Sequence, residues 1–231
     1  DNVMIIDDES VDNQESIINN IEDKEEIEEE SISDDSKILK SSNSEQDKLG
    51  STIYVEEQKP KTNQMTDPTI QNAISSANAG DTIIIKGQTY AHCHFIVNKT
   101  LTIISEVGTV MTPCPSNTQG SRAHGIFYIT PEASGTIIKG FTLMDDDEYT
   151  LENDYGIYIN GASNVKIINC TIESGIADGI RVTNATNTEI TNSIIKDSNI
   201  GINIINSSQT TIKSNEITNN TKTGINISGT A

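Results

Sequence analysis

A carboxylate and a guanidinium stand three residues apart in this sequence, at Asp178 and Arg181, downstream of two tyrosines. Such a pair could form half of a lyase site, in which a basic side chain removes a proton from the substrate. An ion pair across a turn explains the same spacing more simply. We take both residues, with Tyr155, Tyr158 and Asn203, as the candidate ligand-binding set, and we expect no catalytic residue.

An acidic loop runs from Met144 to Tyr155 and carries six carboxylates. Oxygen ligands at this density suit Ca²⁺, which is the cofactor that we consider for this loop. The loop lacks the Asp-x-Asp-x-Asp-Gly spacing of a dedicated calcium loop, and a solvated acidic loop is the simpler explanation. The candidate calcium ligands are Asp145, Asp146, Asp147, Glu148 and Asp154.

All three histidines and two of the three cysteines lie between residues 92 and 124. These side chains are ligands of zinc or copper, although His92-Cys93-His94 does not match a zinc-site spacing. Cys93 and Cys114 are 21 residues apart, close to one repeat of the chain. Stacking on neighbouring coils would bring them within disulfide reach, so a metal site, a disulfide and two free thiols all remain open.

The tripeptide Asn-x-Ser/Thr occurs six times, which predicts N-glycosylation if the protein is exported. Turns rich in asparagine and threonine produce such tripeptides by chance, so we expect roughly half or fewer to be used. The six acceptors are Asn98, Asn169, Asn184, Asn206, Asn219 and Asn226.

A repeat of the chain must position these groups. Segments of the form Gly-Ile-x-Ile, with Val for the last Ile at Gly179, start at Gly156, Gly179, Gly201 and Gly224, at intervals of 23, 22 and 23 residues. An earlier and longer copy opens at Gly125. A fixed period of this length indicates a solenoid.

Each repeat contains three short isoleucine-bearing strands separated by Gly, Asn, Asp or Ser. One repeat cannot bury its apolar face alone, whereas coils stacked about 4.8 Å apart place isoleucine on isoleucine and pair every backbone group. Ile167, Ile190 and Ile212 form one such column, and Asn169 and Asn192 share a turn position. We predict an all-β, right-handed parallel β-helix with about 22–23 residues per coil.

The outward columns of the first strand in each repeat carry no carboxylate. One column reads Tyr158, Arg181, Asn203 and Asn226, and the next reads Asn160, Thr183, Ile205 and Ser228. Because glycoside hydrolysis requires two carboxyl groups, these columns favour binding over catalysis.

Two domains are expected. Residues 1–50 hold 17 of the 34 acidic and 4 of the 15 basic residues, which predicts a disordered acidic segment. Residues 51–231 form the β-helix domain, with a capping helix at about 67–79 and regular coils over 125–231 that we expect to continue beyond Ala231.

Charge and composition exclude several function classes. The formal net charge of −19 disfavours nucleic acid and anionic membrane as partners. No apolar run approaches the roughly 18 residues of a membrane span, so direct membrane insertion is not expected. Three cysteines cannot form a disulfide framework, and packing must hold the fold together.

The segment Ile70-Gln-Asn-Ala-Ile-Ser-Ser-Ala-Asn-Ala-Gly-Asp-Thr-Ile-Ile-Ile-Lys-Gly-Gln-Thr-Tyr90 resembles the opening of pectate-lyase-like β-helix proteins. With Thr136-Ile-Ile-Lys-Gly-Phe-Thr and the Gly-Ile-x-Ile coils, nearly the whole chain resembles the adhesin-like surface proteins of methanogenic archaea. The resemblance implies a secreted, glycosylated protein of the cell surface.

The function expected from these observations is adhesion. The chain would be a secreted, non-catalytic module that presents its β-helix to a surface glycan or to a surface protein of a partner cell. The alternative is a carbohydrate-active enzyme of the pectate-lyase-like class, either a calcium-dependent polysaccharide lyase or an epimerase.

Overall fold

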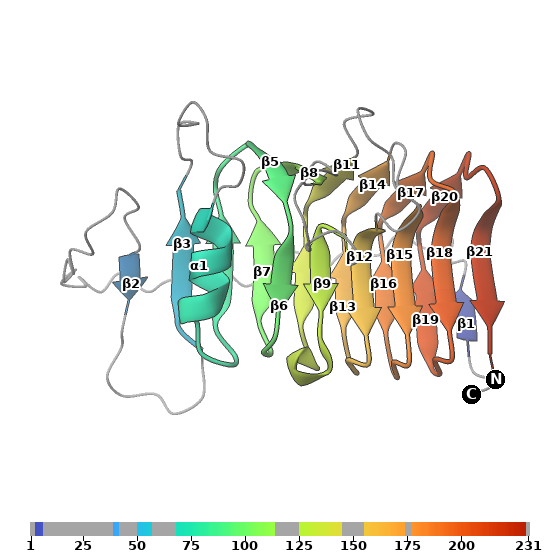
Figure 1. The fold of residues 1–231 in the computed structure, drawn as a ribbon, viewed down its shortest axis with the longest axis horizontal. Helices are drawn as coiled ribbons and strands as arrows, with labels where there is room; N and C mark the ends of the chain where they lie inside the picture. Colours follow the sequence, from blue (N-terminus) through green and yellow to red (C-terminus); the bar gives the residue numbers. More distant parts are fainter. Residues whose placement is uncertain are drawn as a thin grey trace, which may run out of the picture.

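The computed structural model describes residues 3–6, 39–41, 50–56, 68–113, 125–144, 155–173 and 177–229. Over these residues the chain winds repeatedly through three sheets, which we name A, B and C, and the strands of each sheet stack along one long axis (Figure 1). No helix in the described ranges is long and apolar enough to cross a membrane.

The strands form three sheets, which make up the three sides of the coil. Sheet A contains β1 (Val3–Ile6), β2 (Leu39–Ser41), β3 (Thr52–Val55), β4 (Thr82–Ile85), β7 (Thr102–Ser105), β10 (Ile137–Lys139), β13 (Lys166–Ile168), β16 (Glu189–Thr191) and β19 (Thr210–Lys213). Sheet B contains β5 (Thr89–Cys93), β8 (Val110–Pro113), β11 (Thr142–Met144), β14 (Thr171–Glu173), β17 (Ile194–Lys196) and β20 (Glu216–Thr218). Sheet C contains β6 (Phe95–Val97), β9 (Phe127–Ile129), β12 (Tyr155–Asn160), β15 (Asp178–Thr183), β18 (Ile200–Ile205) and β21 (Thr223–Ser228). A short 3₁₀ turn, η1 (Pro131–Ala133), follows β9.

The predicted stacking of isoleucines is confirmed by the strand register. Ile167 pairs with Ile190, which pairs with Ile212, and all three are at most 3% exposed. In sheet C the inward positions Ile157 and Ile180 are partners and fully buried. Since side chains alternate across a strand, the residues between these positions face outward. Each coil therefore buries one apolar face against its neighbours along the axis.

The corners of the coils require the left-handed backbone conformation, which explains their composition. Asn169 and Asn192 have φ of 52°, and Ser214 at the same position of the next coil has 55°. Asparagine tolerates this region better than most residues, and glycine adopts it at no steric cost. The equivalent corner of the preceding coil is Gly140, with φ of 83°. The asparagine-rich turns are thus set by backbone geometry.

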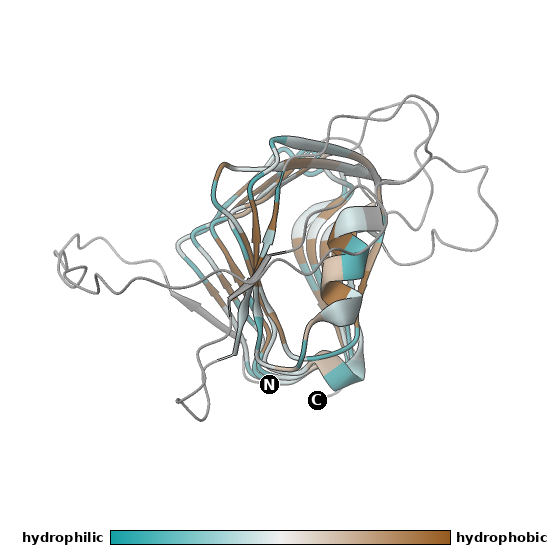
Figure 2. Cartoon of the chain, turned by 90° about the vertical axis from the view of Figure 1, so that its left-hand side faces the viewer, coloured by the Kyte–Doolittle hydropathy of each residue, from teal (hydrophilic) through white to brown (hydrophobic). Residues whose placement is uncertain are grey.

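One helix, α1 (Pro68–Ser76), lies at the first end against β3, β4 and β6. In the end-on view it lies along one wall of the coil (Figure 2). The Gln71 side chain accepts a hydrogen bond from the Ile96 amide at 2.9 Å and donates to the Ile96 carbonyl at 3.4 Å. It therefore pairs with the open edge of sheet C as another strand would. This is the capping role predicted for the helix.

The helix is shorter than the predicted span of 67–79. It ends at Ser76, where the Lys99 ammonium donates to the carbonyls of Ser75 and Ala77 at 3.0 and 2.9 Å. The Asp81 carboxylate then accepts a hydrogen bond from the Asn78 amide at 2.7 Å. These side chains satisfy backbone groups that a longer helix would have paired internally.

Two strands lie inside the segment predicted to be disordered. Val3–Ile6 pairs in parallel with β19 at the far end of sheet A, and Leu39–Ser41 pairs antiparallel with β3. For these seven residues the structure has strand where the sequence predicts disorder. The other residues of 1–49 lie outside the described ranges, and there the prediction of disorder stays a prediction.

Candidate ligand-binding site on sheet C

One outward column of sheet C carries a row of polar and aromatic side chains, which we name the strip. Its members are consecutive register partners on five neighbouring strands. In order along the axis they are Tyr128, Tyr158, Arg181, Asn203 and Asn226. The inward residues on either side of each are apolar, which fixes the outward direction of the column.

Three tyrosine rings and one guanidinium form the first half of the site. The ring centroids of Tyr128 and Tyr158 are 5.3 Å apart, and those of Tyr155 and Tyr158 are also 5.3 Å apart, edge to face. The Arg181 guanidinium lies 5.1 Å from the Tyr155 centroid and 5.7 Å from that of Tyr158. Cation–π attraction thus adds to ring packing in holding the group together.

Asp178 anchors the other side of Arg181. Its carboxylate lies 3.0 Å from Arg181 Nη1 and accepts a hydrogen bond from Asn203 Nδ2 at 2.8 Å. Asn203 Oδ1 in turn accepts from Asn226 Nδ2 at 2.9 Å. Asp178 is only 5% exposed, so its charge is held by these partners more than by water. The structure therefore makes the Asp178–Arg181 ion pair one link in a chain of side chains along the strip.

Asn203 differs from the expectation that an outward residue is exposed. It faces outward by register, yet it is 6% exposed because Asp178 and Asn226 bond to both ends of its amide. All five predicted ligand-binding residues, Tyr155, Tyr158, Asp178, Arg181 and Asn203, are nevertheless brought together by these contacts.

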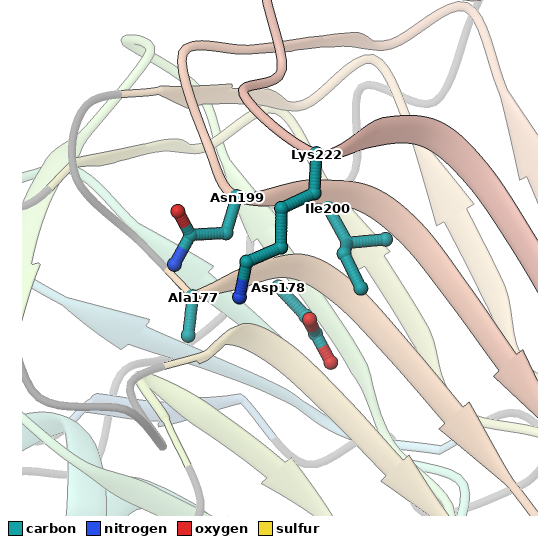
Figure 3. Close-up of a pocket in the computed structure, with 5 residues that line it drawn as sticks. All are labelled: Ala177, Asp178, Asn199, Ile200 and Lys222. Carbon is teal, nitrogen blue, oxygen red and sulfur yellow. The ribbon is translucent and has the colours of Figure 1, made fainter.

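A shallow pocket of about 310 Å³ opens beside Asp178, lined by Ala177, Asp178, Asn199, Ile200 and Lys222. The Lys222 side chain reaches over it toward Ala177 and Asp178 from the coil of β21, two coils beyond β15 (Figure 3). Lys222 brings a second positive charge close to Asp178.

The small number of carboxylates on this face limits the reactions that it could catalyse. In the described strands of sheet C, Asp178 is the one outward carboxylate, and it is already bonded to Arg181 and Asn203. Glycoside hydrolysis uses two carboxyls on opposite sides of the scissile bond. The rings, amides and hydroxyls of the strip can instead stack on a ligand and exchange hydrogen bonds with it.

The metal and thiol candidates fall only partly within the described residues. The proposed calcium ligands Asp145, Asp146, Asp147, Glu148 and Asp154 lie outside the described residues, as do Cys114 and His124. His94 Nδ1 lies 2.8 Å from the Gly125 carbonyl, and Cys93 is buried. Within the described ranges no three His, Cys, Asp or Glu side chains converge as metal ligands. Burial raises the pKa of Cys170 to about 11, so its thiol is protonated at neutral pH.

The glycosylation candidates fall into two groups. Five acceptor side chains are exposed, and they are Asn98, Asn169, Asn184, Asn206 and Asn219. Asn226 is half-buried and its amide is engaged by Asn203. Glycosylation of Asn226 would break the amide chain of the strip, so the geometry favours the other five.

Tyr128 and Asn160 belong to the site but were missed by sequence reasoning. Tyr128 pairs with Tyr158, and its hydroxyl accepts from Asn160 Nδ2 at 2.8 Å. Aligning Gly125 with Gly156 places Phe127 opposite Tyr158, whereas the structure pairs Phe127 with Ile157. Alignment on Ile129 and Ile159 instead of on the glycines would have revealed the second tyrosine.

Comparisons with known proteins address the fold. A family model described as a right-handed beta helix region matches residues 124–231. A solved structure named ORF18 of Geobacillus virus E2 is similar, with a TM-score of 0.50 and 16% sequence identity. The match covers 62% of this chain and 32% of that chain, so the present chain spans about a third of that protein's length. No curated protein matches the sequence. The three stacked parallel sheets and the matched family model together establish the architecture, and the chain is a right-handed parallel β-helix.

Proposed function

We propose that this protein is a non-catalytic adhesin whose β-helix presents the strip on sheet C to a glycan. The observation that carries the proposal is the row of tyrosines beside a fully engaged Asp178–Arg181–Asn203 network. Aromatic faces bind the apolar faces of sugar rings, and amides bind their hydroxyls. The rigid stack of coils holds these groups in place without a ligand, which lowers the entropy cost of binding.

The same network supports binding over catalysis. A lyase needs a basic group that can approach the substrate and take a proton. Arg181 is instead packed over two tyrosine rings and paired with Asp178. A calcium-dependent lyase or an epimerase remains the second candidate through the acidic loop, and incubation with polysaccharides would reveal an unsaturated or epimerised product.

A direct test compares two tyrosines in equivalent surroundings. Tyr158 lies in the strip, whereas Tyr54 lies on β3 of sheet A with the Lys86 ammonium 4.5 Å from its ring centroid. On a glycan array, Tyr158→Ala should reduce the affinity for every bound glycan about tenfold or more, equivalent to about 1.4 kcal/mol. Tyr54→Ala should leave it unchanged. Equal binding by both variants and the parent would refute the site, and turnover of any glycan would refute the non-catalytic assignment.

Exposure at the cell surface is the second part of the proposal. It is supported by five exposed Asn-x-Ser/Thr acceptors on the coils. Mass spectrometry of the protein from its own cells should find glycan on some of these five and none on Asn226. Antibody labelling of intact cells should reach the protein, and labelling only after lysis would contradict secretion.

A further inference from the structure

We propose that the strip selects an uncharged, extended polysaccharide and rejects polyuronates, with one sugar residue bound on each coil. This inference rests on the proposed glycan-binding function and names the chemical class of its ligand.

The spacing of the strip supports binding of one sugar per coil. Neighbouring strands in a sheet are about 4.8 Å apart, and the Tyr128 and Tyr158 ring centroids are 5.3 Å apart. An extended chain of pyranose units has a repeat close to this distance. A polysaccharide lying along the solenoid axis would therefore place successive sugars over successive strip residues.

The order of residues along the strip suggests how each sugar is held. The first two positions offer aromatic rings, which suit the C–H faces of a sugar. Of the last two, Asn226 is half-buried and its amide suits a sugar hydroxyl. Asn203 is 6% exposed and bonded to Asp178 and Asn226, so it supports its neighbours in the strip. The five positions together span about 19 Å along the axis.

The charges of the strip support an uncharged ligand. Its one cation, Arg181, is 3.0 Å from the Asp178 carboxylate, so the pair is neutral as a unit. The other members of the strip are Tyr and Asn residues. A polyuronate carries one negative charge per sugar, and along the strip those charges would meet no further cation. The net charge of −19 adds a general repulsion of polyanions.

Asp178 is the residue that sets this neutrality. It is buried and held by Asn203, so it stays in place when a ligand covers the strip. Lys222, another cation near Asp178, reaches over the pocket that Asp178 lines (Figure 3). Removing the Asp178 charge would leave Arg181 as an unbalanced positive charge in the middle of the strip.

The experiment measures binding of hexasaccharides of two classes by calorimetry. The neutral probes are cellohexaose, xylohexaose and mannohexaose, and the charged probe is hexagalacturonate. We expect at least one neutral probe to bind about tenfold more tightly than hexagalacturonate, with affinity rising from trimer to pentamer and then levelling. Asp178→Asn should gain binding of hexagalacturonate that weakens as salt is added, because the new attraction is between exposed charges.

The outcomes separate the two proposals. Tyr158→Ala should lose the neutral probe and Tyr54→Ala should keep it, with unchanged melting temperatures as the check on folding. Preference of the parent for hexagalacturonate, with loss in Tyr158→Ala, would overturn the ligand class and keep the glycan-binding function. Failure of Asp178→Asn to gain the charged probe would overturn the role of Asp178. Binding of neither class would refute the glycan-binding function itself.

Discussion

The two ends of the solenoid are covered to different degrees. At the first end Ile53 and Ile83 of sheet A, and Ile70 and Ile74 of α1, are fully buried. In the last coil Ile217 and Ile225 occupy equivalent inward columns but are only partly buried, and Ile227 is 53% exposed. Ile225 is the register partner of Ile202, which is fully buried, so an isoleucine at the same column position is buried less when nothing stacks beyond it.

The last coil contains both a strand that has a further partner and strands that have none. Ile212 of β19 is 3% exposed, and β1 pairs with β19 there in parallel register. No strand of the described residues pairs with the outer edges of β20 and β21. An added strand thus supplies the backbone partners that the edge of a sheet otherwise lacks. What matters is cover on both sides, whichever element provides it.

The largest loss of stability is expected for a substitution in a coil that has a neighbouring coil on both sides. Ile190→Asp would bury an unpaired carboxylate between Ile167 and Ile212, at a cost of about 4 kcal/mol or more. Ile194 is 37% exposed on the next strand, so Ile194→Asp should cost about 1 kcal/mol or less. Chemical denaturation measures both, and similar losses would show that the inward and outward columns are assigned wrongly.

Smaller losses of stability are expected for two substitutions, one at each end of the solenoid. Ile74→Ala, in the helix at the covered end, should destabilise the protein by about 3 kcal/mol because it leaves a cavity in a closed core. Ile225→Ala, in the partly buried last coil, should cost about 1 kcal/mol. Unfolding midpoints in denaturant report the difference. If Ile225→Ala proved as costly as Ile74→Ala, the last coil would be covered in solution by a second chain.

Substitutions at the corners of the coils should change stability through backbone conformation, whether or not the ends are covered. Asn192 has φ of 52° between β16 and β17, where a Cβ without a polar partner is disfavoured. Asn192→Ala should therefore cost about 1 kcal/mol, and Asn192→Gly should cost close to nothing. A thermal shift assay on the pair checks this order. A more stable alanine variant would mean that the corner relaxes out of the left-handed region.

The smallest effect concerns β1. Deleting residues 1–7 should lower global stability by about 0.5 kcal/mol, since a four-residue edge strand contributes little. Its local effect should be clearer, because hydrogen exchange of the β19 amides should accelerate while that of the β16 amides stays as before. Unchanged exchange in β19 would show that β1 does not cover this edge in solution.

Much of the candidate site could be predicted because it follows the period of the chain. Tyr158, Arg181 and Asn203 are one repeat apart, so any stacking of coils brings them together. Tyr128 was missed because one extra residue in its coil shifts the glycine relative to the strand. The strand register at this coil depends on which residues pack inward. Counting residues from the glycine does not identify those inward residues.

The burial of Asn203 and the pocket under Lys222 also lay beyond prediction. Alternation along the strand places Asn203 outward, but two neighbouring side chains then close over it. Lys222 and Asp178 belong to coils two apart along the axis, and the structure shows that they line the same pocket. Side-chain contacts between coils depend on turn shape, which the repeat length does not specify.

The sequence by itself determined the coil, its inward columns and its asparagine corners, because stacking of a repeated strand pattern has one arrangement that buries the isoleucines and pairs the backbone. The sequence also predicted the capping helix, but only the tertiary structure decided which contacts cover the two ends. At the first end, Gln71 forms hydrogen bonds with the edge of sheet C. At the other end, Val3–Ile6 pairs with β19, which lies more than 200 residues away in the sequence. Neither contact follows from a local pattern, because an open edge accepts any segment with free backbone groups that can reach it.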